Sequence, residues 1–247
     1  MKNNNKFRLD VWGAITLGTI ALYALFLLYP MAYLIRQSVL DPDTGGFTLA
    51  YFTKFFSKSY YFDTLINSFK VSITATVLSI AIGTPLAYLF TIFKIKGKSV
   101  LNILIVVASM SAPFIGAYSW ILLLGRSGVI TAFFKNLGIA IPDIYGFGGI
   151  VLVMTLQLFP LVFLYAKGAL KNIDNSLIEA AENLGCSGIV CFFKVVVPLI
   201  MPTLLAAALL VFMRSFADFG TPMLIGEGYR TFPVVLYTCL LYTSPSP

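Results

Sequence analysis

The 247-residue chain is 59% hydrophobic, only 11% of its residues are charged, and its mean hydropathy is +0.90. A soluble domain averages about 25% charged residues, so a soluble core is not plausible and a lipid bilayer is the expected environment. The absence of histidine, the spacing of the three cysteines and the dispersed net charge of +7 argue against a metal site, a redox centre and nucleic-acid binding.

Five apolar runs have the length of membrane-spanning helices, for which about 20 residues suffice. In chain order they are Val11–Ile35, Val71–Phe93, Val100–Leu124, Phe147–Tyr165 and about Val195–Met213. Each run is predicted to be helical, because lipid cannot satisfy backbone hydrogen bonds. The sequence therefore predicts an all-α, polytopic transmembrane helix bundle that forms a single domain over residues 1–247.

A sixth run, from Phe232 to about Tyr242, is too short to cross the hydrocarbon layer. We therefore expect five full spans and a truncated sixth. The tail "CLLYTSPSP" also resembles the translation of a common sequencing adapter, so residues 239–247 are expected to be non-native and Cys239 to have no role.

The lysines and arginines predict the orientation of the bundle, because these residues concentrate in cytoplasmic loops. The two sides of the predicted topology hold nine and eight of them, so the count alone does not decide. The side with the N-terminus, the second-to-third connection and the fourth-to-fifth loop has the denser clusters and is predicted to be cytoplasmic. On the outer side, the aromatic segment 48–65 predicts an interfacial helix or a surface that docks a partner.

The fourth-to-fifth loop contains a short polar helix with a signal at each end. Ser176 and Glu179 fit a capping box and Gly185 offers a left-handed stop, which predicts a helix over 176–185. Its apolar stripe consists of Leu177, Ala180, Ala181 and Leu184. A helix this short is not stable alone in water, so the stripe must pack against its own bundle or against another protein. A second helix is predicted to start at Ser187.

The stretch "EAAENLG", followed thirteen residues after Gly185 by Pro198, resembles the EAA loop of bacterial ABC importer permeases. The segments "SAPFIGAYSWILLLGR" and "FADFGTPMLIGEGYRTFPV" are similar to iron(III)-type permeases of that superfamily, many of which fuse two such halves in one chain. The resemblance implies the type I ABC importer permease fold, with this chain as the first half of a possible fused double permease. The motif residues that match are Glu179, Ala180, Ala181, Leu184, Gly185 and Pro198.

The same resemblance implies the partners. The loop would be a coupling helix that sits in a cleft of a cytoplasmic ABC ATPase dimer. A phosphate-binding G-x-x-x-x-G-K-[ST] motif is absent from the sequence, so the ATPase must be a separate chain. A periplasmic or lipid-anchored solute-binding protein and a second permease half, fused or separate, complete the implied assembly in the bacterial inner membrane, with the N-terminus cytoplasmic. No cofactor and no catalytic residue are expected.

Two sets of residues are candidates for the translocation path or an outer gate. Pro113 and Gly116 predict a break in the third run that lines a cavity, although small residues also serve helix packing. Gln157 and Pro160 in the fourth run are equally ambiguous. Arg214 and Asp218, four residues apart, predict an interfacial ion pair or a part in the outer gate or in docking the binding protein.

Other function classes fit less well. An ion-coupled secondary transporter needs titratable groups deep in the bundle, and the five runs have none at mid-depth. A membrane enzyme needs a nucleophile–base pair or a metal cluster, and neither is evident. The resemblance implies iron(III) as substrate, whereas aminoethylphosphonate, thiamine and polyamine permeases share many of the same features and remain alternatives.

Overall fold

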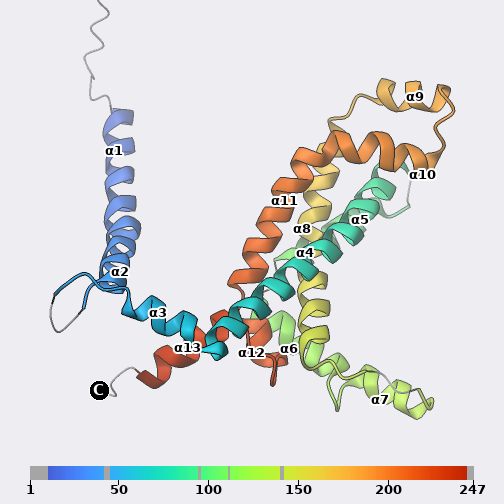
Figure 1. Cartoon of the computed structure of the whole chain (residues 1–247). Helices are drawn as coiled ribbons and strands as arrows, with labels where there is room; N and C mark the ends of the chain where they lie inside the picture. The colour runs from blue at the N-terminus through green and yellow to red at the C-terminus, as the bar shows by residue number, and fades with distance from the viewer. Residues whose placement is uncertain (1–10, 42–44, 94–95, 111, 140–141, 244–247) are drawn as a thin grey trace, which may run out of the picture. The chain divides into compact units, whose positions relative to one another are not determined.

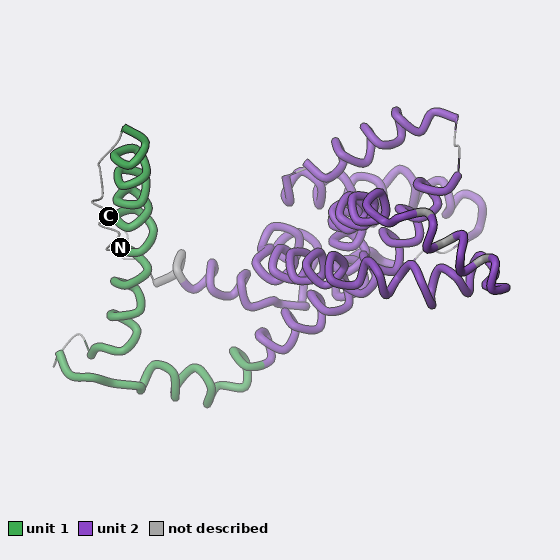
Figure 2. The backbone as a smooth tube through the Cα atoms, turned by 90° about the horizontal axis from the view of Figure 1, so that it is seen from above, with its two compact units in different colours: residues 1–62 green, residues 63–247 purple. Residues whose placement is uncertain are grey.

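The computed structural model describes residues 11–41, 45–93, 96–110, 112–139 and 142–243. Regular structure in these ranges is helical, apart from an isolated antiparallel bridge between Leu40 and Phe47. The chain divides into two compact units, Met1–Phe62 and Asp63–Pro247 (Figure 2). The predicted all-α architecture is confirmed.

The first unit consists mainly of one long apolar helix. It comprises α1 (Val11–Tyr23), a π-helical turn η1 (Ala24–Leu28) and α2 (Tyr29–Val39), and the short helix α3 (Ala50–Ser57) follows. In this turn the Tyr29 amide donates to the carbonyl of Ala24, which lies one residue further back than the acceptor in an α-helix. The next residue, Pro30, has no amide hydrogen to donate. No residue of α1, η1 or α2 is buried, as expected for a helix whose neighbours are lipid or other chains.

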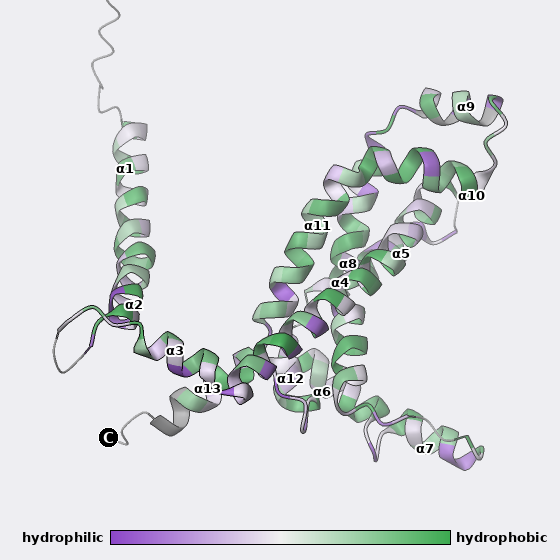
Figure 3. Ribbon diagram, in the orientation of Figure 1, coloured by the Kyte–Doolittle hydropathy of each residue, from purple (hydrophilic) through white to green (hydrophobic). Residues whose placement is uncertain are grey.

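The second unit is a helix bundle (Figure 1). Its elements are α4 (Ser59–Ile92), α5 (Lys98–Ser109), α6 (Pro113–Leu124), α7 (Val129–Asn136), α8 (Phe147–Lys171), α9 (Asn175–Asn183), α10 (Gly188–Cys191), the π-helical turn η2 (Phe192–Val196), α11 (Val197–Ala217), α12 (Gly220–Ile225) and α13 (Phe232–Thr243). Within this unit, α9 and α10 lie at one end of the bundle, and α6, α7 and α12 lie at the other. Figure 3 shows hydrophobic residues along the length of α8 and α11.

Small residues let α4 approach α8 closely. The buried positions of α4 recur every three or four residues and include Ser72, Ala75, Ser79, Gly83 and Ala87. A Cβ on Gly83 would lie 2.9 Å from both the Phe159 carbonyl oxygen and the Val162 Cβ, so this position leaves no room for a side chain. Close backbone approach through such stripes is a common way for helices to pack in lipid, where no hydrophobic effect drives them together.

The third apolar run is broken, which corrects the prediction of one span over Val100–Leu124. Helix α5 ends at Ser109 and α6 begins at Pro113, with Ala112 in an extended conformation at φ −69° and ψ 141°. The cause is steric, because the proline ring disfavours helical geometry at the residue before it. The prediction from hydropathy alone could not separate the two helices, since both are apolar.

Five helical stretches in the described ranges are long and apolar enough to cross a membrane. They are Val11–Val39, Ser59–Ile92, Pro113–Asn136, Phe147–Lys171 and Gly188–Ala217. The third of these joins α6 to α7 in place of the predicted run. Helix α13 has 12 residues, in agreement with the short sixth run. Residues 244–247 of the suspected non-native tail lie outside the described residues, so that hypothesis stays a prediction.

Candidate functional site

Helix α9 begins at a capping residue two positions before the predicted one. The Oδ1 of Asp174 accepts a hydrogen bond from the Ser176 amide at 3.0 Å, and the Asp174 carbonyl accepts one from the Leu177 amide at 3.1 Å. Asp174 is therefore the N-cap, and Ser176 lies inside the first turn, so the proposed capping box of Ser176 and Glu179 is wrong. A carboxylate is a stronger acceptor than a hydroxyl and is favoured by the helix dipole at this end.

The charge of this cap is stabilised by the helix itself. The backbone and side-chain hydrogen bonds from Ser176 hold the pKa of Asp174 below its ordinary value. Asp174 is exposed, so burial opposes this shift only weakly. The cap is therefore ionised at neutral pH.

Gly185 provides the left-handed stop after α9 that the sequence predicts, and the last helical residue is Asn183. This glycine has φ +85°, the left-handed conformation, and the Cys186 amide donates to the Ala181 carbonyl at 3.0 Å. That hydrogen bond over six residues defines a Schellman motif, which satisfies the carbonyl groups that the helix end leaves free. Both ends of α9 are thus fixed by local interactions, and neither requires contact with the bundle.

The apolar stripe of α9 is not covered by the bundle. The side chains of Leu177 and Leu184 are 49% and 89% exposed, and Glu179 and Ala180 are exposed as well. Ala181 is the exception, being partly buried. The alternative in which this helix folds back on its own bundle is therefore not what the structure contains. The stripe is available to a partner.

A continuous helix connects α9 to the other end of the bundle. Ser187 has the extended N-cap conformation, φ −83° and ψ 154°, which confirms the predicted second helix. From Gly188 the chain stays helical to Ala217, through the π-helical turn η2 that precedes Pro198. Phe192 is buried and packs against Tyr88 with ring centroids 4.6 Å apart and the rings tilted by 52°, so the start of this helix is anchored on α4.

A cavity of about 450 Å³ lies where α5 ends, α6 and α12 begin and α11 ends. It is lined by Ser109, Pro113, Phe114, Gln157, Leu158, Arg214, Ala217, Asp218, Phe219 and Gly220. The structure therefore brings together Pro113, Arg214 and Asp218, three of the four residues proposed for the path. Gly116 lies one turn further along α6 and is not among the lining residues.

Arg214 and Asp218 do not form the predicted ion pair. Helix α11 ends at Ala217, and Asp218 has the extended values φ −72° and ψ 123°, so the spacing of four residues no longer places the two side chains on one helical face. The Asp218 carboxylate instead caps α12. It accepts hydrogen bonds from the Thr221 hydroxyl at 2.7 Å and from the Gly220 amide at 2.9 Å.

Polar residues on α8 and α11 meet beside the cavity. The buried Ser215 hydroxyl donates to the Met154 sulfur at 3.1 Å and joins the last turn of α11 to α8. One turn from Met154, Gln157 is among the residues that line the cavity. Its Nε2 is a buried atom without a hydrogen-bond partner among the described residues.

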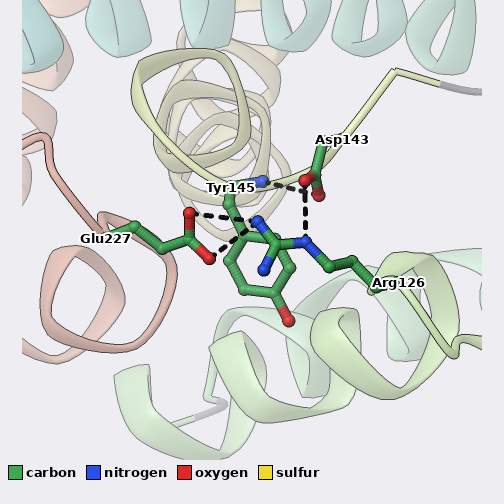
Figure 4. A network of polar contacts seen from close by, with 4 residues as sticks. All are labelled: Arg126, Asp143, Tyr145 and Glu227. Carbon is green, nitrogen blue, oxygen red and sulfur yellow. Dashed lines mark hydrogen bonds and ion pairs between the residues drawn. The ribbon is translucent and has the colours of Figure 1, made fainter.

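A second polar cluster, which the sequence did not predict, is formed by Arg126, Asp143, Tyr145 and Glu227 (Figure 4). The Arg126 guanidinium lies 3.0 Å from an Asp143 oxygen and 2.9 Å from a Glu227 oxygen, and 4.7 Å above the ring of Tyr145. Three loops meet here: the turn after α6, the segment before α8, 17 residues further along the chain, and the turn after α12, which is 101 residues from the first. The only sequence signal is a lone arginine next to a glycine turn, which does not identify its partners.

These features define a class of protein. A bundle of helices long and apolar enough to cross a membrane, with a cavity between them and an exposed, doubly capped helix at one end, is the architecture of a polytopic membrane protein. The chain belongs to the family described as "binding-protein-dependent transport system inner membrane component", whose sequence profile matches residues 44–238.

Similar proteins include permeases named for different substrates. The chain is 28% identical over 220 residues to the putative ferric transport system permease protein FbpB 1 of Haemophilus influenzae, covering 88% of this chain and 34% of that protein. It is also 28% identical over 232 residues to the spermidine/putrescine transport system permease protein PotB of the same species, covering 90% of this chain and 79% of that protein. A second ferric transport system permease protein FbpB, from Actinobacillus pleuropneumoniae, is also similar. The chain spans about a third of the length of each of these two ferric relatives.

Solved structures share the fold. The crystal structure of a bacterial alginate ABC transporter in complex with an alginate pentasaccharide-bound periplasmic protein superposes with a TM-score of 0.76 at 16% identity, covering 94% of this chain and 83% of that chain. A second structure of an alginate ABC transporter gives a TM-score of 0.68 at 18% identity. At this identity the comparison establishes the architecture, which is that of an ABC importer permease.

Proposed function

We propose that this chain is the transmembrane permease subunit of a binding-protein-dependent ABC importer, in which α9 couples the translocation path to a separate ATPase. The observation that supports this most is the exposure of Leu177 and Leu184 on a helix that is capped at both ends. A short helix with an uncovered apolar stripe is stable only if its caps are strong or a partner covers it. Helix α9 has the caps and presents the stripe outward.

The proposed orientation places α9 and the N-terminus in the cytoplasm. Lysines support it, because Lys98 begins α5, Lys171 ends α8 and Lys194 lies in η2, all near the same end of the bundle as α9. Positive charge beside span ends favours the cytoplasmic side. The cavity then lies toward the outer side, where a solute-binding protein would deliver its cargo.

The helix that follows α9 offers a mechanical connection to the cavity. It runs unbroken from Gly188 to Ala217, and Arg214 in its last turn lines the cavity. Packed helices move as rigid bodies, so displacement of α9 by an ATPase would shift the lining of the cavity. In this proposal the ATPase dimer supplies the energy, the binding protein supplies the cargo, and a second permease half, fused or separate, completes the path.

Iron(III) is the substrate that we propose, with support from the ferric relatives. Polyamines are the main alternative because PotB proteins are about as similar, and aminoethylphosphonate and thiamine also remain. The proposal treats the metal as cargo: the described residues contain no group of three or more His, Cys, Asp or Glu side chains that could hold a resident metal ion.

The coupling role is tested in the full complex, reconstituted in lipid with its ATPase and binding protein. We expect loaded binding protein to raise ATP hydrolysis, and Leu184→Arg to abolish that stimulation because it places a charge in the contact. The matched control is Leu137→Arg, which alters an exposed leucine that caps α7 at the other end of the bundle. Equal stimulation in Leu184→Arg and in the unmodified chain would refute the coupling role of α9.

A further inference from the structure

An apolar groove lies at the α9 end of the bundle, between the last turns of α4 and the start of the helix that follows α9. It has a volume of about 470 Å³, and its lining comes from residues within 85–93 and 188–193. Among the described residues that line it, none is charged. Two of the apolar side chains are largely uncovered, since Ile189 is 78% exposed and Phe193 is 64% exposed. The groove is therefore open to an apolar ligand.

Both walls of the groove belong to helices that are long and apolar enough to cross a membrane. One wall ends the stretch Ser59–Ile92, and the other begins the stretch Gly188–Ala217. The groove thus lies where two spans meet the membrane surface, at the boundary between hydrocarbon and lipid headgroups. The apolar ligand that is present at this depth is the acyl chain of a lipid.

Two lysines form a charged rim beside this groove. Lys194 directly follows Phe193, and Lys96 follows Phe93 by three residues, so its Cα lies at most about 11 Å from that of Phe93. Both lysines are exposed, and neither forms an ion pair within the described part of the chain. A lysine stem covers apolar surface while its ammonium group stays at the polar boundary, which is where a lipid phosphate lies.

The segments that form the two walls carry no negative charge of their own. The sequence contains no Asp or Glu between residues 64 and 142, nor between residues 183 and 217. Clusters of basic side chains directly cytoplasmic of membrane-spanning helices attract anionic lipids. An apolar groove with a lysine rim therefore complements an anionic phospholipid, which joins an acyl chain to a phosphate.

Helix α9 and the lysine rim carry opposite charges and so require different partners. The chain has no lysine or arginine from residue 172 to residue 193, whereas Asp174, Glu179 and Glu182 lie in the same stretch. A protein cleft that accepts α9 has to be complementary to negative charge, and such a surface would repel the lysines of the rim. The groove is therefore not a continuation of the surface that α9 offers to an ATPase.

We propose that this groove binds one anionic phospholipid of the cytoplasmic leaflet, with an acyl chain between its two walls and the phosphate group beside Lys96 and Lys194. The choice of leaflet rests on the orientation proposed above. The bound lipid would hold the start of the helix after α9 against α4, next to the contact of Phe192 with Tyr88.

The test uses the assembled permease complex, delipidated in detergent and titrated with phosphatidylglycerol or with phosphatidylcholine of the same acyl chains. Native mass spectrometry counts the bound lipids and gives an affinity for each. We expect one phosphatidylglycerol to bind about tenfold or more tightly than phosphatidylcholine, because two lysines act on its charge. Lys96→Gln combined with Lys194→Gln is expected to remove this preference. Lys135→Gln, on α7 at the other end of the bundle, is the control for removal of a positive charge.

A second variant tests the groove itself. Ile189→Glu places a carboxylate in the lining, at a side chain that is exposed, so the fold is preserved while both the acyl chain and the phosphate are disfavoured. This variant is expected to lose the tightly bound phosphatidylglycerol. The matched control is Val129→Glu, which alters an exposed β-branched residue at the start of α7.

Three results would overturn the lipid site. The first is equal affinity for the two lipids, and the second is a preference that survives the loss of both lysines. The third is an Ile189→Glu variant that keeps its lipid but releases the ATPase or the second permease half, because the groove would then be a protein interface. Lipid binding in detergent requires neither ATP nor cargo, so a failure of loaded binding protein to stimulate ATP hydrolysis would refute the proposed transport function alone.

Discussion

The guanidinium of Arg126 lies 2.9 Å from a carboxylate oxygen of Glu227, although the two residues are 101 positions apart in the chain. The same guanidinium forms an ion pair with Asp143. The Gly146 amide also donates a hydrogen bond to the Ile225 carbonyl at 2.9 Å. Backbone and side-chain interactions therefore both join the segment before α8 to the turn after α12. Because these groups are largely exposed, the ion pairs act on the local order of the loops more than on the stability of the bundle.

Replacing Arg126 with Ala is expected to loosen both loops at once. Amide hydrogen exchange should accelerate at Gly146 and at Tyr229, whose amide donates to the Gly226 carbonyl at 2.8 Å, while α9 remains unchanged. High salt should have the same effect on the unmodified protein, since the screening length falls from about 10 Å at 0.1 M to about 3 Å at 1 M. Lys135→Ala, a charge removal on neighbouring α7, is the control. Faster exchange in one loop alone would contradict a shared network.

Gly83 provides a direct test of the α4–α8 contact. Gly83→Ala places a Cβ 2.9 Å from the Phe159 carbonyl oxygen, and overpacking of this kind typically costs about 1–3 kcal/mol. The matched control is Gly168→Ala on α8, where no atom lies within 4 Å of the added Cβ. Thermal unfolding in detergent should show a lower Tm for the first variant and an unchanged or higher Tm for the second, because alanine favours helix over glycine. Equal Tm values for Gly83→Ala and Gly168→Ala would mean that α4 and α8 can move apart to accommodate the added methyl group without loss of stability.

How much of this molecule follows from its sequence depends on whether the deciding interaction is local. The left-handed stop at Gly185, just after the last residue of α9, was predicted correctly, because such a glycine stop depends on a few adjacent residues. Its start was misplaced because Asp174 and Ser176 are both good caps, and the choice between them is an energetic competition that a pattern does not resolve.

Longer-range features were less accessible. Hydropathy located the apolar runs but not the break before Pro113, since the residues on both sides are equally apolar. The spacing of Arg214 and Asp218 predicted an ion pair only on the assumption that the helix continues through Asp218, whereas α11 ends at Ala217. The contact of Arg126 with Glu227 joins loops brought together by tertiary packing, and no single-sequence rule identifies it.

The caps of α9 predict a specific loss of coupling. Gly185→Ala forces a Cβ into a left-handed conformation, at a cost of about 1–2 kcal/mol, and should displace the end of α9 from its position. Gly188→Ala, three residues further along, is the control, because no atom lies within 4 Å of its Cβ and its φ is not positive. We expect stimulated ATP hydrolysis in the reconstituted complex to fall in the first variant only, with the Tm of both close to that of the unmodified chain. A matched fall in both variants would show that the left-handed turn is not the cause.

Asp174 predicts how α9 responds to acid. Hydrogen bonds with Ser176 hold the pKa of the Asp174 carboxyl lower in the folded protein than in the unfolded chain. The cap therefore stabilises α9 fully above the unfolded pKa of about 4, and this stabilisation is lost as the pH falls through the lower pKa of the folded protein. A spin label on Leu184→Cys, in a chain whose other cysteines are replaced, should therefore report an ordered helix end at neutral pH and increasing mobility only below about pH 4. Asp174→Asn keeps a capping oxygen without the titration and should remove this pH dependence. A transition near pH 6, or one that persists in Asp174→Asn, would assign the acid response to a different group.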